Sequence, residues 1–259
     1  MGHQHLGTLS RSRKWREIIE LIDGGANVQE VAAATSAAAE QQMMDTSDDP
    51  ALKHSFWLLT QIPIAARKED FALELRQLGF RISDRPTLLE VATAMSGAVD
   101  RFVARKGGRT DVGEMAQLSA LESLNAIAGR ELPDLFDQVV EKTKSALGGL
   151  GTARQFAVLA RDFFSRLTRR HLDYFLSRQL SQHVGFNSRF QTIREHRQFD
   201  EALDLHCREA SRIIKEFSGE WFSKHTYEGG ITETKAGNFA HVAFHKMRDE
   251  LRQRRSTHA

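Results

Sequence analysis

The chain has 259 residues, of which 41% are hydrophobic and 27% are charged, and its formal net charge is +2. This composition excludes an intrinsically disordered chain, and the near-neutral charge gives no overall field that would attract a polyanion. The single cysteine, Cys207, excludes an intrachain disulfide framework and a zinc site built from several thiolates.

The chain shows no signal-peptide core at its start and no run that approaches the roughly 18 apolar residues of a membrane span. The sequence therefore predicts no transmembrane segment and a cytoplasmic location.

Hydrophobic residues recur with helical spacing along nearly the whole chain, and glycines, prolines and capping residues separate the segments. In chain order, the pattern predicts helices over residues 11–23, 28–44, 50–63, 71–78, 86–106, 110–128, 133–148, 152–184 and 200–217. A last helix is expected from near Thr232 or Thr234 to beyond Leu251.

The segment 152–184 is the longest of these helices, because apolar residues continue at steps of three and four with no glycine or proline inside it. At 1.5 Å per residue it would be a rod of about 50 Å. The 16 phenylalanines, against 2 tyrosines and 3 tryptophans, favour packed helices over an aromatic-lined binding surface. We therefore expect an all-α bundle of about nine or ten helices around this rod. It would form one body over 1–259, or divide near the GGLGT stretch into halves at 1–148 and 152–259.

The last predicted helix carries His241 and His245 four residues apart, so both imidazoles lie on one face. Metalloproteases of the H-E-x-x-H type need Glu after the first histidine, but Val242 stands there. Asn238, Arg248 and Arg252 continue the same face. Its cations favour an anion or an acidic partner over a metal ion, and an ordinary polar helix face is the alternative.

The segment 219–239 concentrates aromatic residues and glycines between two predicted helices, and we expect it to be a loop. Its Trp221 and Tyr227 either dock the loop onto the body or line a binding site beside His241 and His245.

The most basic region spans residues 166–197, where phenylalanines are interleaved with seven arginines: Arg166, Arg169, Arg170, Arg178, Arg189, Arg194 and Arg197. Such a pattern could follow phosphates and stack on bases. A solvated helix face with buried phenylalanines is the alternative, and Asp173 has the spacing to pair with Arg169 or Arg170.

At the start of the chain, His3 and His5 leave three readings open: docking onto the fold, contact with a partner, or loose binding of a metal ion. Nucleophile elbows, phosphate-binding loops and dinucleotide fingerprints are absent from the sequence.

Because no coherent catalytic set emerges, we expect a non-catalytic interaction or adaptor subunit of a larger bacterial assembly, with a protein partner or a second copy and no cofactor. Two alternatives are a nucleic-acid-associated protein that uses the arginine-rich region and a small metal-dependent enzyme that uses the C-terminal histidines.

Overall fold

A computed structural model describes residues 13–38, 47–132, 140–186 and 188–256. These residues adopt the predicted all-α fold: no strand occurs among them, apart from a single bridge between Val184 and Phe190. The described part holds eleven α-helices and one short 3₁₀ helix, where nine or ten helices were predicted.

The helices follow one another with short connections. They are α1 (Arg13–Asp23), α2 (Val28–Ala38), α4 (Pro50–Ala65), α5 (Phe71–Gln77), α6 (Leu88–Lys106), α7 (Asp111–Ala128), the 3₁₀ helix η1 (Gly129–Glu131), α8 (Val140–Gly149), α9 (Ala153–Gln182), α10 (Ile193–Ala210), α11 (Arg212–Tyr227) and α12 (Glu233–Ser256).

Polar side chains fix where several helices begin. Asp49 accepts hydrogen bonds from the backbone N–H groups of Ala51 and Leu52, at 2.8 and 2.9 Å, and so caps α4. Thr110 and Thr152 cap α7 and α9 in the same way. Asp49 also accepts the Thr110 hydroxyl at 2.6 Å, so one carboxylate ties the starts of α4 and α7 together.

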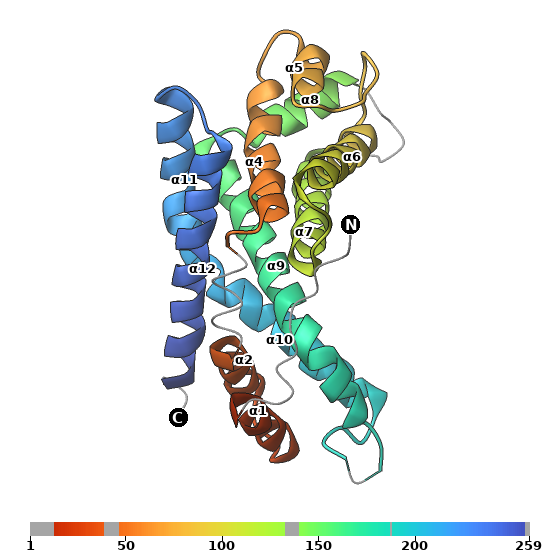
Figure 1. Cartoon of the computed structure of the whole chain (residues 1–259), viewed down its shortest axis with the longest axis vertical. Coiled ribbons are helices and arrows are strands. Elements are labelled where there is room, and N and C mark those ends of the chain that lie inside the picture. Colours follow the sequence, from red (N-terminus) through yellow and green to blue (C-terminus); the bar gives the residue numbers. More distant parts are fainter. Residues whose placement is uncertain (1–12, 39–46, 133–139, 187, 257–259) are drawn as a thin grey trace.

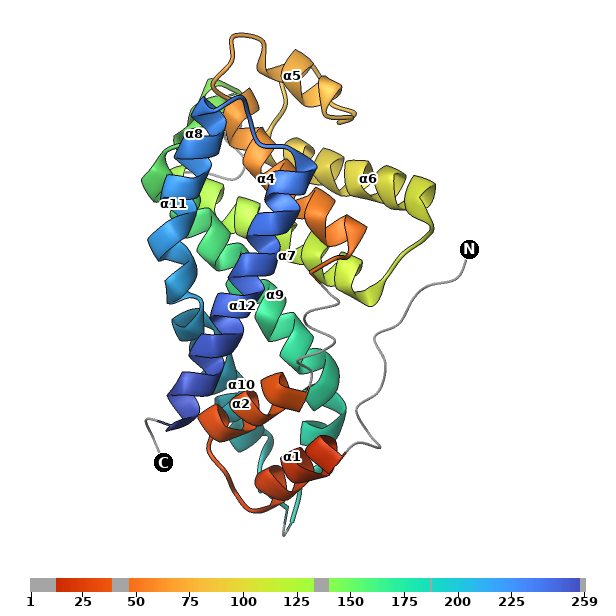
Figure 2. The same cartoon turned by 60° about the vertical axis from the view of Figure 1, so that its left-hand side comes forward.

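The predicted rod is α9, whose 30 residues span about 45 Å and run obliquely through the molecule (Figure 1). Helices α7, α10 and α11 pack along it, and α4 and α12 pack against each other beside it. In both views α5 and α8 lie at one end of the molecule, while α1 and the connection from α9 to α10 lie at the other (Figure 2).

Phenylalanine rings join these layers. Phe56 of α4 stacks on Phe163 of α9, with ring centroids 5.4 Å apart, and on Phe239 of α12 at 5.3 Å. Phe156 of α9 stacks on Phe222 of α11 at 4.0 Å. The buried apolar residues make one contiguous cluster that draws on both the 1–148 and the 152–259 parts of the chain.

The prediction for residues 200–239 was wrong in two respects. Instead of one helix over 200–217, the chain forms α10 and α11 with a break at Ser211, and residues 219–227 belong to α11 rather than to a loop. Gly219 does not end the helix; it permits close packing. A methyl group there would lie 2.5 Å from the carbonyl oxygen of Ala153, so only glycine lets α11 approach the start of α9 this closely.

Candidate functional site

The predicted pairing of His241 and His245 on α12 is present in the structure. Their ring centroids are 4.7 Å apart, and the Nδ1 atom of the exposed His241 lies 2.9 Å from the hydroxyl of the buried Ser47. Arg248, one turn further along, contacts the carboxylate of its neighbour Asp249 at 2.8 Å. Each of these groups already has a protein partner, which fits a polar helix face.

The structure separates the other residues predicted for this surface. Trp221 packs into the aromatic core, 4.4 Å from Phe239. Tyr227 is 93% exposed at the end of α11, and no hydrogen bond or ring contact joins it to His241 in the described part. The side chain of Arg252 lies outside the described residues, as do His3 and His5. Within the described residues, no group of three or more His, Cys, Asp or Glu side chains is placed to hold a metal ion.

Three of the seven arginines of the arginine-rich region form ion pairs within the fold. Arg166 and Arg170 of α9 both pair with Glu122 of α7, and Arg166 also pairs with Asp162 at 2.6 Å. Burial disfavours the charged guanidinium of Arg166, but the pairs with Asp162 and Glu122 outweigh this cost and raise its pKa.

The third of these arginines, Arg169, pairs with Asp173, as its spacing predicted, and with Asp200 of α10 at 3.3 Å. These three arginines hold α7, α9 and α10 together, and they do not form a free cationic track.

The arginine-rich region continues through a tight loop between α9 and α10, which carries Arg189, and into α10, which carries Arg194 and Arg197. In this loop the N–H of Gly185 donates to the carbonyl of Phe190 at 2.8 Å, and the N–H of Phe190 donates to the carbonyl of His183 at 2.9 Å. Gly185 has φ 142°, a backbone conformation that favours glycine. These bonds join the two sides of the loop through its described residues.

Two side chains fasten this loop to the body. The imidazole of His183 lies 2.8 Å from the carboxylate of Asp23, at the end of α1, and the Arg189 guanidinium donates to the carbonyl of Ala26 at 3.4 Å. At the loop's outer side Phe186 is 94% exposed, whereas Phe190, four residues later, is buried. The sequence did not distinguish these two phenylalanines, although Gly185 before Phe186 is a turn signal.

Part of the exposed apolar surface lies on this loop and on α10. Eight large hydrophobic residues are exposed in the described part, and three of them are Phe186, Ile193 (72% exposed) and Leu205 (59%). Arg194 and Arg197 are exposed between them on α10, and neither has an ion-pair partner among the described residues. We call Phe186, Ile193, Arg194 and Arg197 the α10 surface. The Arg178 side chain lies outside the described part.

A half-buried pair of titratable groups links α4 to the start of α12. His54 Nδ1 lies 2.9 Å from Glu233 Oε1, and the imidazole stacks on Phe102 at 3.9 Å. Burial lowers the pKa of His54, although Glu233 partly offsets this effect. The indole N–H of Trp57 donates to the carbonyl of Ile231 at 2.8 Å beside the pair. These contacts hold the turn before α12 against α4, which is a structural role.

Two further features have structural roles. Burial raises the pKa of the Cys207 thiol to about 12, so this cysteine is not a nucleophile near neutral pH.

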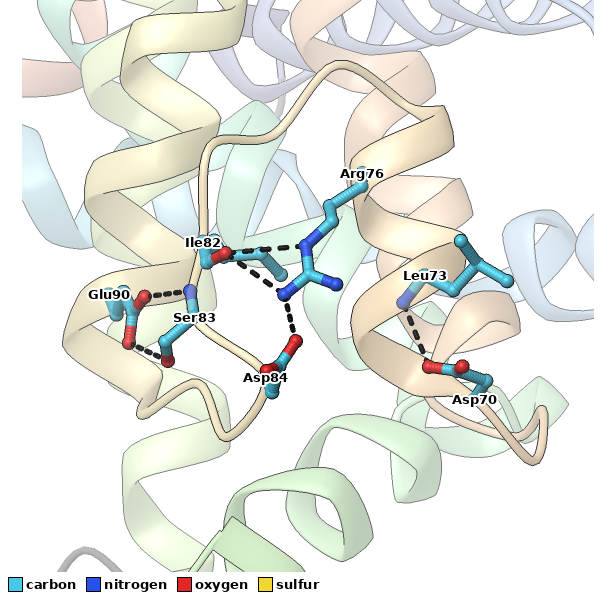
Figure 3. Close-up of polar contacts among 7 residues, drawn as sticks. All are labelled: Asp70, Leu73, Arg76, Ile82, Ser83, Asp84 and Glu90. Carbon is cyan, nitrogen blue, oxygen red and sulfur yellow. Dashed lines mark hydrogen bonds and ion pairs between the residues drawn. The ribbon is translucent and has the colours of Figure 1, made fainter.

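Figure 3 shows the loop between α5 and α6, where Arg76 donates to the carbonyl of Ile82 and to the carboxylate of Asp84, and Ser83 donates twice to Glu90. The charged groups drawn there hold the loop in shape.

Among the described helices, none combines the length and the apolar character needed to cross a bilayer. Comparison of the chain with protein-family models, with curated proteins and with solved structures returned no match.

Proposed function

We propose that the protein is a non-catalytic interaction subunit, an adaptor that binds another protein through the α10 surface. The observation that carries this proposal is Phe186, which is 94% exposed on a loop whose two sides are joined by backbone hydrogen bonds. Full burial of a phenylalanine side chain stabilises by about 1.5–3 kcal/mol. The isolated chain lacks this stabilisation at Phe186, because the ring lies in water. A partner that covers Phe186 would gain it at little cost in loop ordering.

The residues around Phe186 define the chemistry of the partner. Ile193, seven residues further along the chain at the start of α10, is a second exposed apolar side chain, and the adjacent Arg194 and Arg197 have no ion-pair partners in the described part. The complementary surface is an apolar pocket with acidic side chains at its rim. Aromatic residues and arginine are enriched at protein interfaces.

The face of α12 that carries His241 and His245 is a second contact surface within the same proposal. It is polar, and Tyr227, which the sequence grouped with it, lies apart from it at the end of α11 and is 93% exposed. A metal-dependent activity of these histidines is tested by metal analysis of untagged protein, since a stoichiometric ion lost on His241→Ala would establish it.

The experiment compares two equally exposed aromatics. A tagged chain is purified from its native host, co-purifying proteins are identified by quantitative mass spectrometry, and binding of the purified partner is measured for three variants. Phe186→Ala removes the anchor of the α10 surface, Tyr227→Ala tests the surface predicted from sequence, and Leu89→Ala removes an exposed leucine of α6 that belongs to neither.

We expect Phe186→Ala to weaken partner binding about thirtyfold, the effect of an interface hot spot, and Leu89→Ala to leave it unchanged. If only Tyr227→Ala weakens partner binding, the partner contacts the surface predicted from the sequence around Tyr227, His241 and His245 instead. A self-associated chain that becomes monomeric in Phe186→Ala, measured by sedimentation, would identify a second copy as the partner. A monomer that retains no protein contradicts the adaptor proposal.

Nucleic-acid binding is the second candidate function, because exposed arginines without partners lie on the same surface as an exposed phenylalanine that could stack on a base. Glu195 and Glu201 of α10 weaken this reading, since they place negative charge among the arginines. It predicts binding to single-stranded RNA or DNA that falls steeply with added salt and is lost in an Arg194→Gln, Arg197→Gln double variant.

A further inference from the structure

A small pocket opens where the end of α7, the middle of α9 and the junction between α10 and α11 meet. Its volume is about 170 Å³, and three arginines from three different elements line it: Arg130 of η1, Arg161 of α9 and Arg208 of α10. Two aliphatic side chains and the hydroxyl-bearing Ser165 and Ser211 complete the wall. The three positions are far apart in sequence, so only the fold brings these arginines to the wall of one pocket.

The charge in this pocket is not balanced by its own lining. Asp162 is the one carboxylate there, and its oxygen already contacts Arg166 at 2.6 Å. Arg130 has no hydrogen-bond or ion-pair partner among the described residues. Arg208 pairs only with Asp204 at 2.8 Å, an exposed contact of the kind that contributes little. The pocket therefore keeps an excess of positive charge.

One of the three arginines is fixed in place. Arg161 donates one N–H to the backbone carbonyl of Arg208 at 2.9 Å, and the same carbonyl accepts the Ser211 hydroxyl at 2.7 Å. A guanidinium carries five N–H donors, and this hydrogen bond uses one of those of Arg161. This contact closes the end of α10, and an alternative reading is that Arg161 serves only as a cap for that helix.

We propose that this pocket binds a phosphate group, either inorganic phosphate or the phosphomonoester of a small molecule. Guanidinium groups match the oxygen geometry of phosphate through paired N–H donors, and several arginines around one cavity suit a dianion better than a single carboxylate. The volume leaves room for such an anion with water, since one water occupies only about 30 Å³ in the liquid. This site is independent of the α10 surface and of the adaptor function.

The test uses inorganic phosphate as the probe and measures binding to the full chain by ³¹P NMR line broadening and by isothermal titration, against sodium chloride at equal ionic strength. Arg130→Gln removes one cation from the pocket without breaking any contact among the described residues. Arg161→Gln removes the fixed donor. Arg81→Gln is the matched control, because Arg81 is an exposed arginine of the α5–α6 loop with no partner among the described residues. Circular dichroism verifies that each variant is folded.

We expect saturable binding of one phosphate per chain, a dissociation constant about tenfold higher in Arg130→Gln and in Arg161→Gln, and no change in Arg81→Gln. Glycerol phosphate, tested in parallel, distinguishes the sources: tighter binding than phosphate indicates a phosphomonoester, and equal binding indicates the free anion. Phosphate binding that is absent, that chloride reproduces, or that Arg81→Gln weakens equally would overturn the proposal and leave Arg161 as a helix cap.

Discussion

The buried histidine His171 on α9 makes the stability of the fold depend on pH. Its side chain is enclosed in the core, its Nε2 has no hydrogen-bond partner among the described residues, and burial lowers its pKa from 6.5 to about 4. The unfolded chain therefore binds a proton more tightly than the folded one, so the free energy of unfolding falls as the pH drops below 6.5. The fall amounts to about 2 kcal/mol at pH 5 and reaches its limit of about 3 kcal/mol below pH 4.

Urea denaturation at pH 7.5, 6 and 5, followed by far-UV circular dichroism and tryptophan fluorescence, measures this loss. His171→Leu removes the titrating group and an unpaired polar atom while keeping an apolar, helix-compatible side chain, so its stability should fall about 2 kcal/mol less than that of the unaltered chain between pH 7.5 and 5. His241→Gln, which removes an exposed imidazole, is the control. His54 contributes in the same direction in every variant, because its pKa is also lowered. Equal losses in the unaltered chain and in His171→Leu would refute the reasoning.

Three further predictions concern packing, capping and reactivity. Gly219→Ala should destabilise the fold by about 1–3 kcal/mol, because the added methyl group meets a backbone oxygen of α9, whereas Gly129→Ala, where the space is open, should not lower the thermal unfolding temperature. Asp49→Ala should cost about 1–2 kcal/mol in thermal unfolding, since it removes the cap of α4, while its exposed neighbour Asp48→Ala should change stability by less than about 0.5 kcal/mol. Iodoacetamide at pH 8 should label Cys207 only after unfolding in urea, and fast labelling of the folded chain would contradict its buried thiol.

Much of the helical framework could be predicted from the sequence because the signals are local. Asp49 and Thr110 stand immediately before α4 and α7, and a cap acts on backbone groups two or three residues away. The apolar period of 152–184 likewise needs only neighbouring turns, and α9 matches it within two residues at each end. The pairing of Arg169 with Asp173 followed from the same reasoning, since both lie one turn apart on a single helix.

The candidate sites depended on contacts between residues distant in sequence, which no local pattern encodes. Glu122 lies on a helix more than 40 residues earlier in the chain and pairs with Arg166 and Arg170. These two arginines therefore hold helices together and are not free to form a cationic track. The predicted loop begins at Gly219, and only the approach of α9 shows that this position lies inside α11 with no room for a larger side chain.

Sequence thus determined that the chain folds into amphipathic helices with a phenylalanine-rich core and where most of those helices begin. Tertiary structure decided which polar groups pair between helices and that Phe186 lies in solvent while Phe190 is buried. It also brought Arg130, Arg161 and Arg208 to the wall of one pocket. The physical reason is range: hydrogen-bond caps and helical periodicity act within a few residues, whereas burial and charge pairing depend on which distant segments the whole core brings together.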